Sequence, residues 1–247
     1  MYTYLSRTLS RLLLLRFLLS CGACHFLFPS TSLGGSDIDK IDKTVWERYF
    51  GDVGAEPALP SDIVEILDSD CPFWPGKQVK DTHLLVLIPE RVNGKPLTLD
   101  YLGELIKSPR GGGYGAKYRD YHSYVRNAVG HQAPGRSYWV LMTRRLLPES
   151  EYKNYDSQCQ LVVDHANRTG LDYELPGALE AAVVLLLHHV RSGERLYSDN
   201  PLTYTRCRDK DKDGDPLIVG GFSSAGLHVS SSNCAHDSLG VSALRKF

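Results

Sequence analysis

The stretch LPGALEAAVVLLLHHV, residues 175–190, decides the predicted fold. Apolar residues occupy nearly every face of this predicted helix, and a helix that is apolar all round is buried beneath other elements on several sides. Pro176 or Gly177 suits the first turn, and Gly193 can adopt the left-handed conformation that ends a helix. At about 1.5 Å per residue the helix is roughly 20 Å long, which is too short to span a bilayer.

The composition predicts a globular protein with one sizeable core. Hydrophobic residues make up 42% of the 247 residues and charged residues 23%, which are ordinary values for a globular chain. The net charge of −1 gives no general electrostatic attraction to nucleic acid, so we expect no nucleic-acid partner. No later apolar run reaches transmembrane length, so we also expect no transmembrane segment.

Residues 1–29 are predicted to be a signal or lipoprotein leader. Arg7 and Arg11 precede a short apolar run, and small residues follow it. The segment LLSC, residues 18–21, also matches a loose lipoprotein pattern in which Cys21 would carry the lipid. These features predict an exported or lipid-anchored protein, and the alternative is a mis-started N-terminus.

The rest of the chain divides into a linker and one globular domain. Residues 30–60 begin with a polar, glycine- and serine-rich segment, so we predict a linker that contains one short helix. Thr44 and Glu47 form a capping-box pattern that predicts this helix through Phe50. Residues 61–247 are predicted to form the single domain.

Hydrophobic patterns in that domain predict an α+β fold. The continuous apolar run HLLVLI, residues 83–88, predicts a buried strand, and residues 137–143 predict a second strand. Short turns separate the late strands, which favours hairpins and a small antiparallel sheet on which the central helix packs. The late strands are expected at residues 202–207, 217–222, 227–230 and 242–247, and further helices at 61–67, 97–106 and 156–166. Apolar residues between Tyr118 and Val129 also fall at helical spacing.

The C-terminal third resembles the formylglycine-generating-enzyme (sulfatase-modifying-factor)/C-type-lectin-like superfamily. A Leu-Pro step opens a helix containing Glu and Ala, a Gly-Gly-aromatic strand follows, and a short Gly-hydrophobic-Arg strand comes last. These motifs are Leu175-Pro176 with Leu179-Glu180-Ala181, then Gly220-Gly221-Phe222-Ser223, then Gly240-Val241 with Leu244-Arg245. The resemblance implies a C-type-lectin-like fold. Through residues 73–77 and 84–89, the whole chain also resembles an uncharacterised bacterial paralogous family, which implies no activity.

The superfamily resemblance does not extend to formylglycine-generating chemistry. Oxidase members carry two copper-binding cysteines between the Gly-Gly strand and the final Arg strand, and this chain has only Cys234 there. Two thiolates are needed to bind Cu(I) linearly. The superfamily also contains noncatalytic binding proteins, and the resemblance favours that branch.

The remaining candidate sites do not predict a metal or a cofactor. Asp209, Asp211 and Asp213 begin like a calcium loop, but position twelve is Gly220 instead of Glu, so we favour a charged hairpin turn. Residues 110–117, RGGGYGAK, fail the phosphate-loop pattern and predict a plain loop. The spacing of the four cysteines outside the leader leaves two disulfides or four buried thiols open, at positions Cys71, Cys159, Cys207 and Cys234.

These observations favour a noncatalytic binding module over an enzyme. Tyr and Arg anchor interfaces well, and we assign Tyr204 and Arg206 as ligand-binding residues. Related tyrosine and arginine positions in predicted loops are Tyr114, Arg195 and Tyr197. The ligand is expected to be a protein or a glycan. The alternative is an enzyme of unknown class with a reactive cysteine, either Cys234 or Cys207, whose thiol pKa the flanking arginines would lower.

Overall fold

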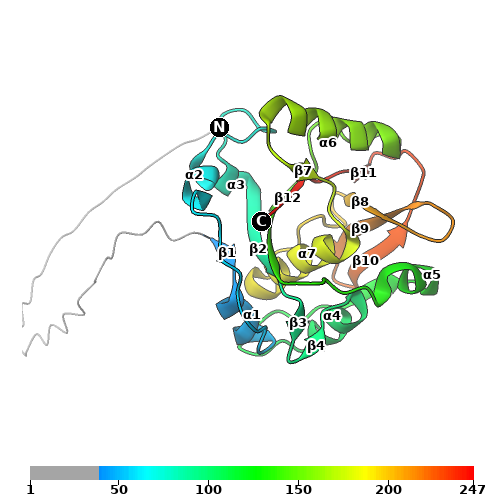
Figure 1. The fold of residues 1–247 in the computed structure, drawn as a ribbon. Helices are drawn as coiled ribbons and strands as arrows, with labels where there is room; N and C mark the ends of the chain where they lie inside the picture. The colour runs from blue at the N-terminus through cyan, green and yellow to red at the C-terminus, as the bar shows by residue number, and fades with distance from the viewer. Residues whose placement is uncertain (1–38) are drawn as a thin grey trace, which may run out of the picture. The chain divides into compact units, whose positions relative to one another are not determined.

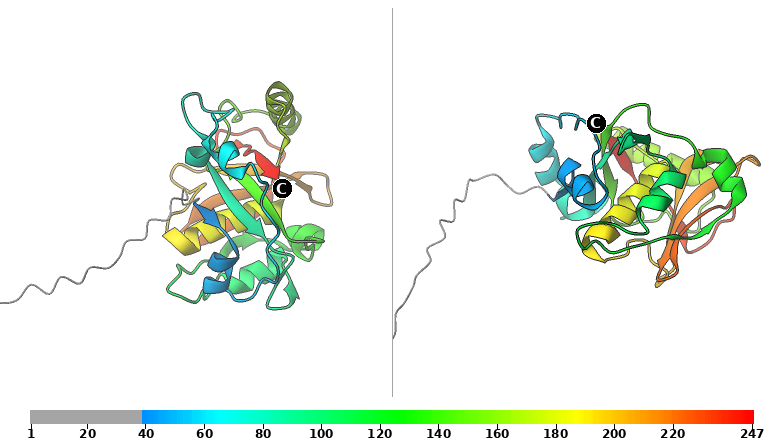
Figure 2. Two further views of the ribbon diagram at one scale, coloured as in Figure 1. Left: turned by 60° about the vertical axis from the view of Figure 1, so that its left-hand side comes forward. Right: turned by 90° about the horizontal axis from the view of Figure 1, so that it is seen from below.

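A computed structural model describes residues 39–247, in which two five-stranded sheets lie around one long apolar helix (Figure 1). The helix is α7 (Ala178–Ser192), and residues 180–190 are all buried. It contacts β2 of the first sheet and β8, β9 and β10 of the second. Figure 2 shows α7 in the interior from two further directions. The predicted central helix and its burial are therefore confirmed.

Both ends of α7 follow from its sequence. The backbone N–H of the N-cap residue Gly177 donates to the carboxylate of Glu180 at 2.6 Å, which satisfies a donor that no helical carbonyl can reach. Gly193 ends the helix at φ 78°, a left-handed conformation that glycine adopts without a steric penalty. The predicted C-terminal glycine is confirmed.

The first sheet has the order β1-β2-β6-β12-β7. Its strands are β1 (Lys40–Ile41), β2 (His83–Ile88), β6 (Tyr138–Thr143), β12 (Leu244–Lys246) and β7 (Tyr173–Glu174). β1 runs parallel to β2, and the other neighbours are antiparallel. The last strand of the chain, β12, therefore lies between β6 and β7, two strands formed much earlier in the sequence.

The second sheet has the order β11-β8-β9-β10-β5. Its strands are β11 (Leu239–Gly240), β8 (Tyr204–Lys210), β9 (Pro216–Ser223), β10 (Gly226–Ser231) and β5 (Tyr118–Tyr121). β8, β9 and β10 form an antiparallel meander, whereas β5 and β11 pair in parallel with their neighbours. The α+β class is confirmed, but the structure has two mixed sheets where the sequence predicted one small antiparallel sheet.

The shorter elements connect and cover these sheets. The helices are α1 (Lys43–Tyr49), α2 (Ile63–Asp68), α3 (Val79–Thr82), α4 (Leu99–Leu105), α5 (Ser123–Val125), the π-helical η1 (Arg126–Gly130) and α6 (Tyr155–Thr169). The strands β3 (Arg91–Val92) and β4 (Lys95–Pro96) form a small hairpin around Asn93-Gly94. The Thr98 side chain accepts a hydrogen bond from the Tyr101 N–H and so caps α4, which confirms the helix predicted at residues 97–106.

Residues 39–60 belong to the globular unit, and the predicted boundary at residue 61 is wrong. Trp46 of α1 is fully buried in the main core, and its indole N–H donates to the carbonyl of Leu87 at 2.9 Å. A polar composition suggested a linker there, but a few large apolar side chains suffice to anchor the segment. The predicted leader at 1–29, with Cys21, and the first part of the predicted linker lie outside the described residues.

The segment between Tyr118 and Val129 also differs from the prediction. Tyr118 and Tyr121 are spaced as on a helix, yet they lie on strand β5, which pairs with β10. Only the later part of the segment is helical, as α5 and η1. The pairing partner lies about a hundred residues away in sequence, so tertiary context overrides the local spacing.

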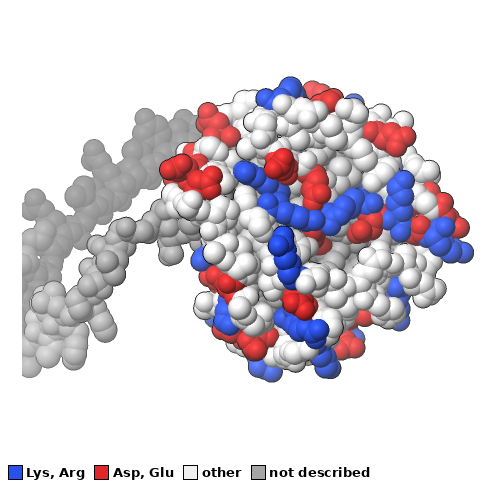
Figure 3. All heavy atoms as spheres, viewed as in Figure 1, with Lys and Arg blue, Asp and Glu red and all other residues white. Residues whose placement is uncertain are grey.

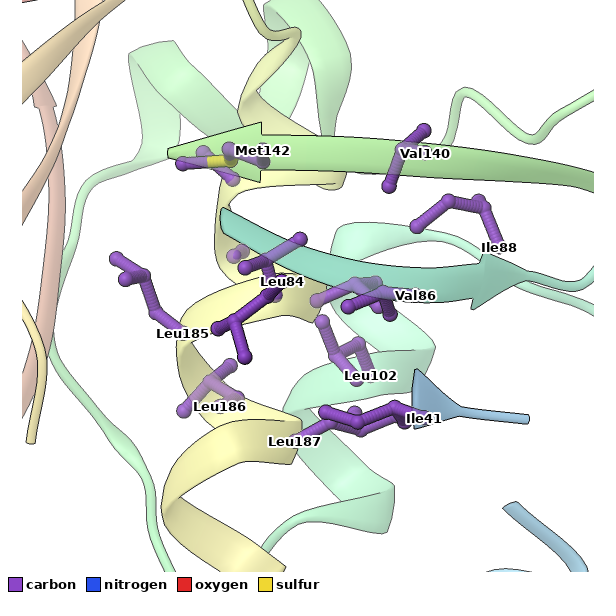
Figure 4. Close-up of a cluster of buried hydrophobic side chains, with 14 of the residues drawn as sticks. Ile41, Leu84, Val86, Ile88, Leu102, Val140, Met142, Leu185, Leu186 and Leu187 are labelled. Atoms are coloured by element: carbon purple, nitrogen blue, oxygen red, sulfur yellow. The ribbon is translucent and has the colours of Figure 1, made fainter. Parts of the chain in front are cut away.

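The main core fills the space between the first sheet and the two helices α4 and α7. Figure 4 shows Leu84 and Val86 of β2 facing the leucines of α7, with Leu102 of α4 beside them. Burying one such side chain stabilises the fold by about 1.5–3 kcal/mol. The strand ends that carry the candidate site are therefore attached to a well-packed scaffold.

Candidate functional site

The structure has an open cleft of about 900 Å³, here called the main cleft. Three segments that are distant in sequence line it: residues 74–82, residues 144–151 and residues 194–203. The second segment follows the end of β6, and the third follows the end of α7. The cleft therefore lies where two of the most buried elements of the fold end.

Hydrogen bonds fix the walls of the main cleft to the core. The Tyr197 hydroxyl donates to the carbonyl of Thr143 at 2.8 Å, and Tyr197 is buried. The backbone N–H of Arg144 donates to the carbonyl of Thr82 at 2.8 Å, which joins two of the lining segments. A surface held in this way is largely pre-formed, as small-ligand and peptide sites usually are.

The cleft presents apolar surface and charges of both signs. Trp74 and Leu146 are half-buried, and the exposed charged side chains stand around them. The lining includes the basic residues Lys77, Arg144, Arg145 and Arg195 and the acidic residues Asp81, Glu149, Glu151 and Glu194. Apolar side chains together with polar and charged ones are the usual composition of a protein-binding surface.

Arg144 is held at the edge of this cleft by an acidic residue from the N-terminal segment. Asp39 lies 3.2 Å from a guanidinium nitrogen of Arg144 and 2.8 Å from one of Arg191. Burial alone would raise the pKa of Asp39, but hydrogen bonds and charge from Arg191 and Arg144 hold the pKa below its usual value. The ion pair with Asp39 therefore orients the guanidinium of Arg144.

Of the two predicted ligand-binding residues, Tyr204 is buried on the second sheet. Its hydroxyl lies 3.1 Å from His228 Nδ1 and 3.5 Å from a guanidinium nitrogen of Arg119. Arg119 in turn forms a 2.8 Å ion pair with Asp120. The structure thus brings Tyr204 together with partners from β5 and β10, and the sequence pattern did not indicate this pairing.

The other predicted ligand-binding residue, Arg206, is fully buried. Its guanidinium donates to the carbonyls of Lys153, Ser232 and Cys234, and to the Gln158 side chain at 2.7 Å. A buried charge needs such partners, because its desolvation is costly. In the structure Arg206 ties β8 to α6 and to the segment after β10, and it does not line the main cleft.

The alternative nucleophile Cys207 does not have the environment of a reactive thiol. It is fully buried, and burial raises the pKa of this thiol well above its ordinary value. Asp209 adds to this effect, so the flanking arginines do not produce a thiolate. Cys71, Cys159 and Cys207 are free thiols, as is the exposed Cys234, so the structure contains four thiols and no disulfide in residues 39–247.

The acidic segment at 209–215 comprises the end of β8 and the turn of the β8–β9 hairpin, which confirms the predicted charged hairpin turn. The Asp211 carboxylate accepts hydrogen bonds from the backbone N–H groups of Asp213 and Asp215. The Asp209 carboxylate accepts one from the Ala178 N–H at the start of α7. Residues 39–247 contain no group of three or more His, Cys, Asp or Glu side chains placed to hold a metal ion.

An ion-pair network closes the N-terminal end of α7. Glu180 is almost fully buried and lies 2.7 Å from Arg208 and 3.1 Å from Lys246. It also accepts hydrogen bonds from the Tyr138 hydroxyl at 2.7 Å and from the Gly177 N–H. Glu174 shares both cations but is half exposed. Figure 3 shows basic and acidic side chains gathered where β7 and β12 reach this face. Glu180 itself is paired with two cations and two hydrogen-bond donors, so the network has a structural role.

Comparison of the chain with protein-family models, with curated proteins and with solved structures found no match. No helix within residues 39–247 is long and apolar enough to cross a membrane, in agreement with the prediction. The resemblance to the C-type-lectin-like superfamily and the predicted binding function therefore stay predictions.

Proposed function

We propose that this protein is a noncatalytic binding module that holds an extended segment of a partner protein in the main cleft. The observation that carries the proposal is the cleft itself, about 900 Å³ in volume and lined by three anchored segments. Ligand pockets have volumes of about 300–1,000 Å³. The cleft therefore has the size of a binding site.

A peptide matches the lining better than a glycan does. Trp74 and Leu146 offer apolar contact, and Arg145 and Glu149 stand near them with opposite charges. A peptide carries apolar and charged side chains of both signs along one chain, whereas a neutral glycan would leave these charges unpaired. Unpaired, desolvated charges reduce affinity. We therefore favour a protein ligand, with a glycan as the competing outcome.

The relation to the C-type-lectin-like superfamily is part of the same proposal. The Leu-Pro motif precedes α7, the Gly-Gly-aromatic motif lies on β9, and the last motif covers β12. Each of the three motifs thus coincides with, or directly precedes, a regular element of the fold. Binding through loops on a rigid scaffold, as in the noncatalytic branch, agrees with a cleft lined by chain segments that follow β6 and α7.

A display experiment with a matched pair of charge reversals tests the proposal. The full chain is immobilised and used to select from a random-peptide library and to probe a glycan array. Arg145→Glu changes an exposed residue of the cleft, and Arg136→Glu makes the same change at an exposed position that does not line it. Trp74→Ala removes apolar contact area.

We expect an enriched peptide family that binds the wild type and Arg136→Glu equally. Arg145→Glu and Trp74→Ala should each weaken its binding about tenfold or more, since interface anchors cost at least that when removed. Equal binding by all four proteins would refute the assignment to the cleft. Glycan binding without peptide selection would replace the protein ligand by a glycan.

A further inference from the structure

A second pocket of about 430 Å³ lies next to the main cleft and shares Arg195 with it. Residues from four places in the sequence line this basic pocket: the end of α4, the start of β5, the end of α7 and the β9–β10 turn. The polar side chains are those of Lys107, Lys117, His189, Arg195, Ser223 and Ser224. The basic pocket therefore lacks the acidic side chains that line the main cleft.

The charge of the basic pocket is uncompensated. Its lining contains three cationic side chains and no Asp or Glu. None of Lys107, Lys117 and Arg195 forms an ion pair within residues 39–247, whereas Arg144 and Arg191 both pair with Asp39. Arg195 instead lies over the ring of Phe222, 5.8 Å from its centre, which holds the guanidinium beside the pocket. Three cations that line one pocket without a carboxylate favour a ligand with more than one negative charge.

A buried histidine also lines the basic pocket. His189 lies in the last turn of α7 and is 4% exposed. Its Nδ1 is closed to solvent, so this atom does not face a ligand in the open pocket. His189 therefore forms part of the wall, and the charged side chains carry the argument for a ligand.

His189 adds no positive charge to the pocket near neutral pH. Burial lowers the pKa of His189, and the charge of Arg195 lowers it further, whereas backbone hydrogen bonds near Glu194, Gly193 and Gly115 oppose this shift. The imidazole is therefore neutral near neutral pH. The Phe222 ring packs edge-on against the imidazole of His189, with 4.9 Å between the ring centres, and this contact fixes the orientation of the imidazole.

We propose that the basic pocket binds a phosphate group, either as the free ion or as a monoester. Lys107, Lys117 and Arg195 would neutralise its two charges, and the Ser224 hydroxyl would donate to one of its oxygens. Ammonium and guanidinium groups bind phosphate through charge-assisted hydrogen bonds. The loop at 110–117 lacks the phosphate-loop pattern, so recognition rests on side chains from separate segments and not on that motif.

The test is titration calorimetry of the full chain with two probes, inorganic phosphate and glycerol 1-phosphate, at constant ionic strength. Lys117→Gln and Arg195→Gln remove one cation each from the pocket. Lys212→Gln and Arg136→Gln remove matching cations from exposed positions outside it. Thermal unfolding of each variant confirms that it is folded.

We expect the pocket variants to bind about tenfold more weakly than wild type and the control variants to bind like wild type. Binding of only one probe identifies whether the free ion or the ester is the source. Absence of binding by either probe at millimolar concentration would overturn the proposal, as would equal losses in pocket and control variants. Lys117 lines only the basic pocket and Arg145 only the main cleft, so this test and the peptide test fail independently.

Discussion

Replacing Glu180 by glutamine should destabilise the fold in a pH-dependent manner. The carboxylate is 1% exposed and contacts Arg208, Lys246, the Tyr138 hydroxyl and the Gly177 N–H. Glutamine keeps the size of the side chain but removes its charge. The two cations then lose their buried partner, and removing one member of such a pair is costly.

The shift in the pKa of Glu180 gives the size of the expected destabilisation. Burial alone would raise this pKa, but the hydrogen bond and charge of Arg208, with the Gly177 and Tyr138 donors, lower it from 4.5 to about 2. That difference corresponds to about 3 kcal/mol of unfolding free energy at neutral pH. Because the pKa of the folded state is lowered, this contribution is present above 4.5 and is lost as the pH falls toward 2.

Urea unfolding of wild type and Glu180→Gln measures the effect. We expect a difference of about 3 kcal/mol at about pH 7, and less than half of it at about pH 3. Glu174→Gln is the control, because Glu174 contacts the same two cations while 44% exposed, and exposed pairs contribute about 1 kcal/mol or less. A Glu180→Gln difference that does not change with pH, or one no larger than that of Glu174→Gln, would refute this reasoning.

Three further changes test the core, the histidine and the thiols. Leu186→Ala should lower the free energy of unfolding by about 2–5 kcal/mol, and Leu186→Asp should give no folded protein by circular dichroism, because Leu186 is fully buried. Burial lowers the pKa of His83 to about 3, so the free energy of unfolding should fall as the pH drops below 6.5. His83→Gln should reduce the slope of the unfolding free energy against pH by about one proton. An unchanged slope in urea titrations would contradict this. A thiol reagent at neutral pH should label exposed Cys234 much faster than buried Cys207, as mass spectrometry of the peptides would show; fast labelling of Cys207 would restore it as a nucleophile.

Long apolar runs made part of the fold predictable. Residues 83–88 and 178–192 are too apolar to lie anywhere but inside, and Thr98 and Gly193 mark helix ends through local hydrogen bonding and φ preference. Each of these signals acts within a few residues. Sequence patterns of this length therefore indicated the elements β2, α4 and α7 correctly.

Contacts between distant segments were not predictable. β5 forms because the free edge of strand β10 is available to pair with it. Arg206 is buried because hydrogen-bond acceptors from residues 153–158 and 232–234 surround its guanidinium. The main cleft likewise needs three separate segments, and the only local signs of it were Trp74 in a turn and two arginines at a strand end. No short motif encodes such a convergence, so the candidate site became visible only in the structure.

The position of β12 has a consequence for the synthesis of the protein. Residues 244–246 pair with β6 on one side and β7 on the other, so the first sheet stays open until they leave the ribosome. Until then the apolar strand β6 has an unpaired edge, and such edges recruit strands from other chains. Domains whose closing contacts come late are exposed to misassembly while they wait. Nascent chains of this protein are therefore expected to depend on chaperones more than the stability of the finished fold would suggest.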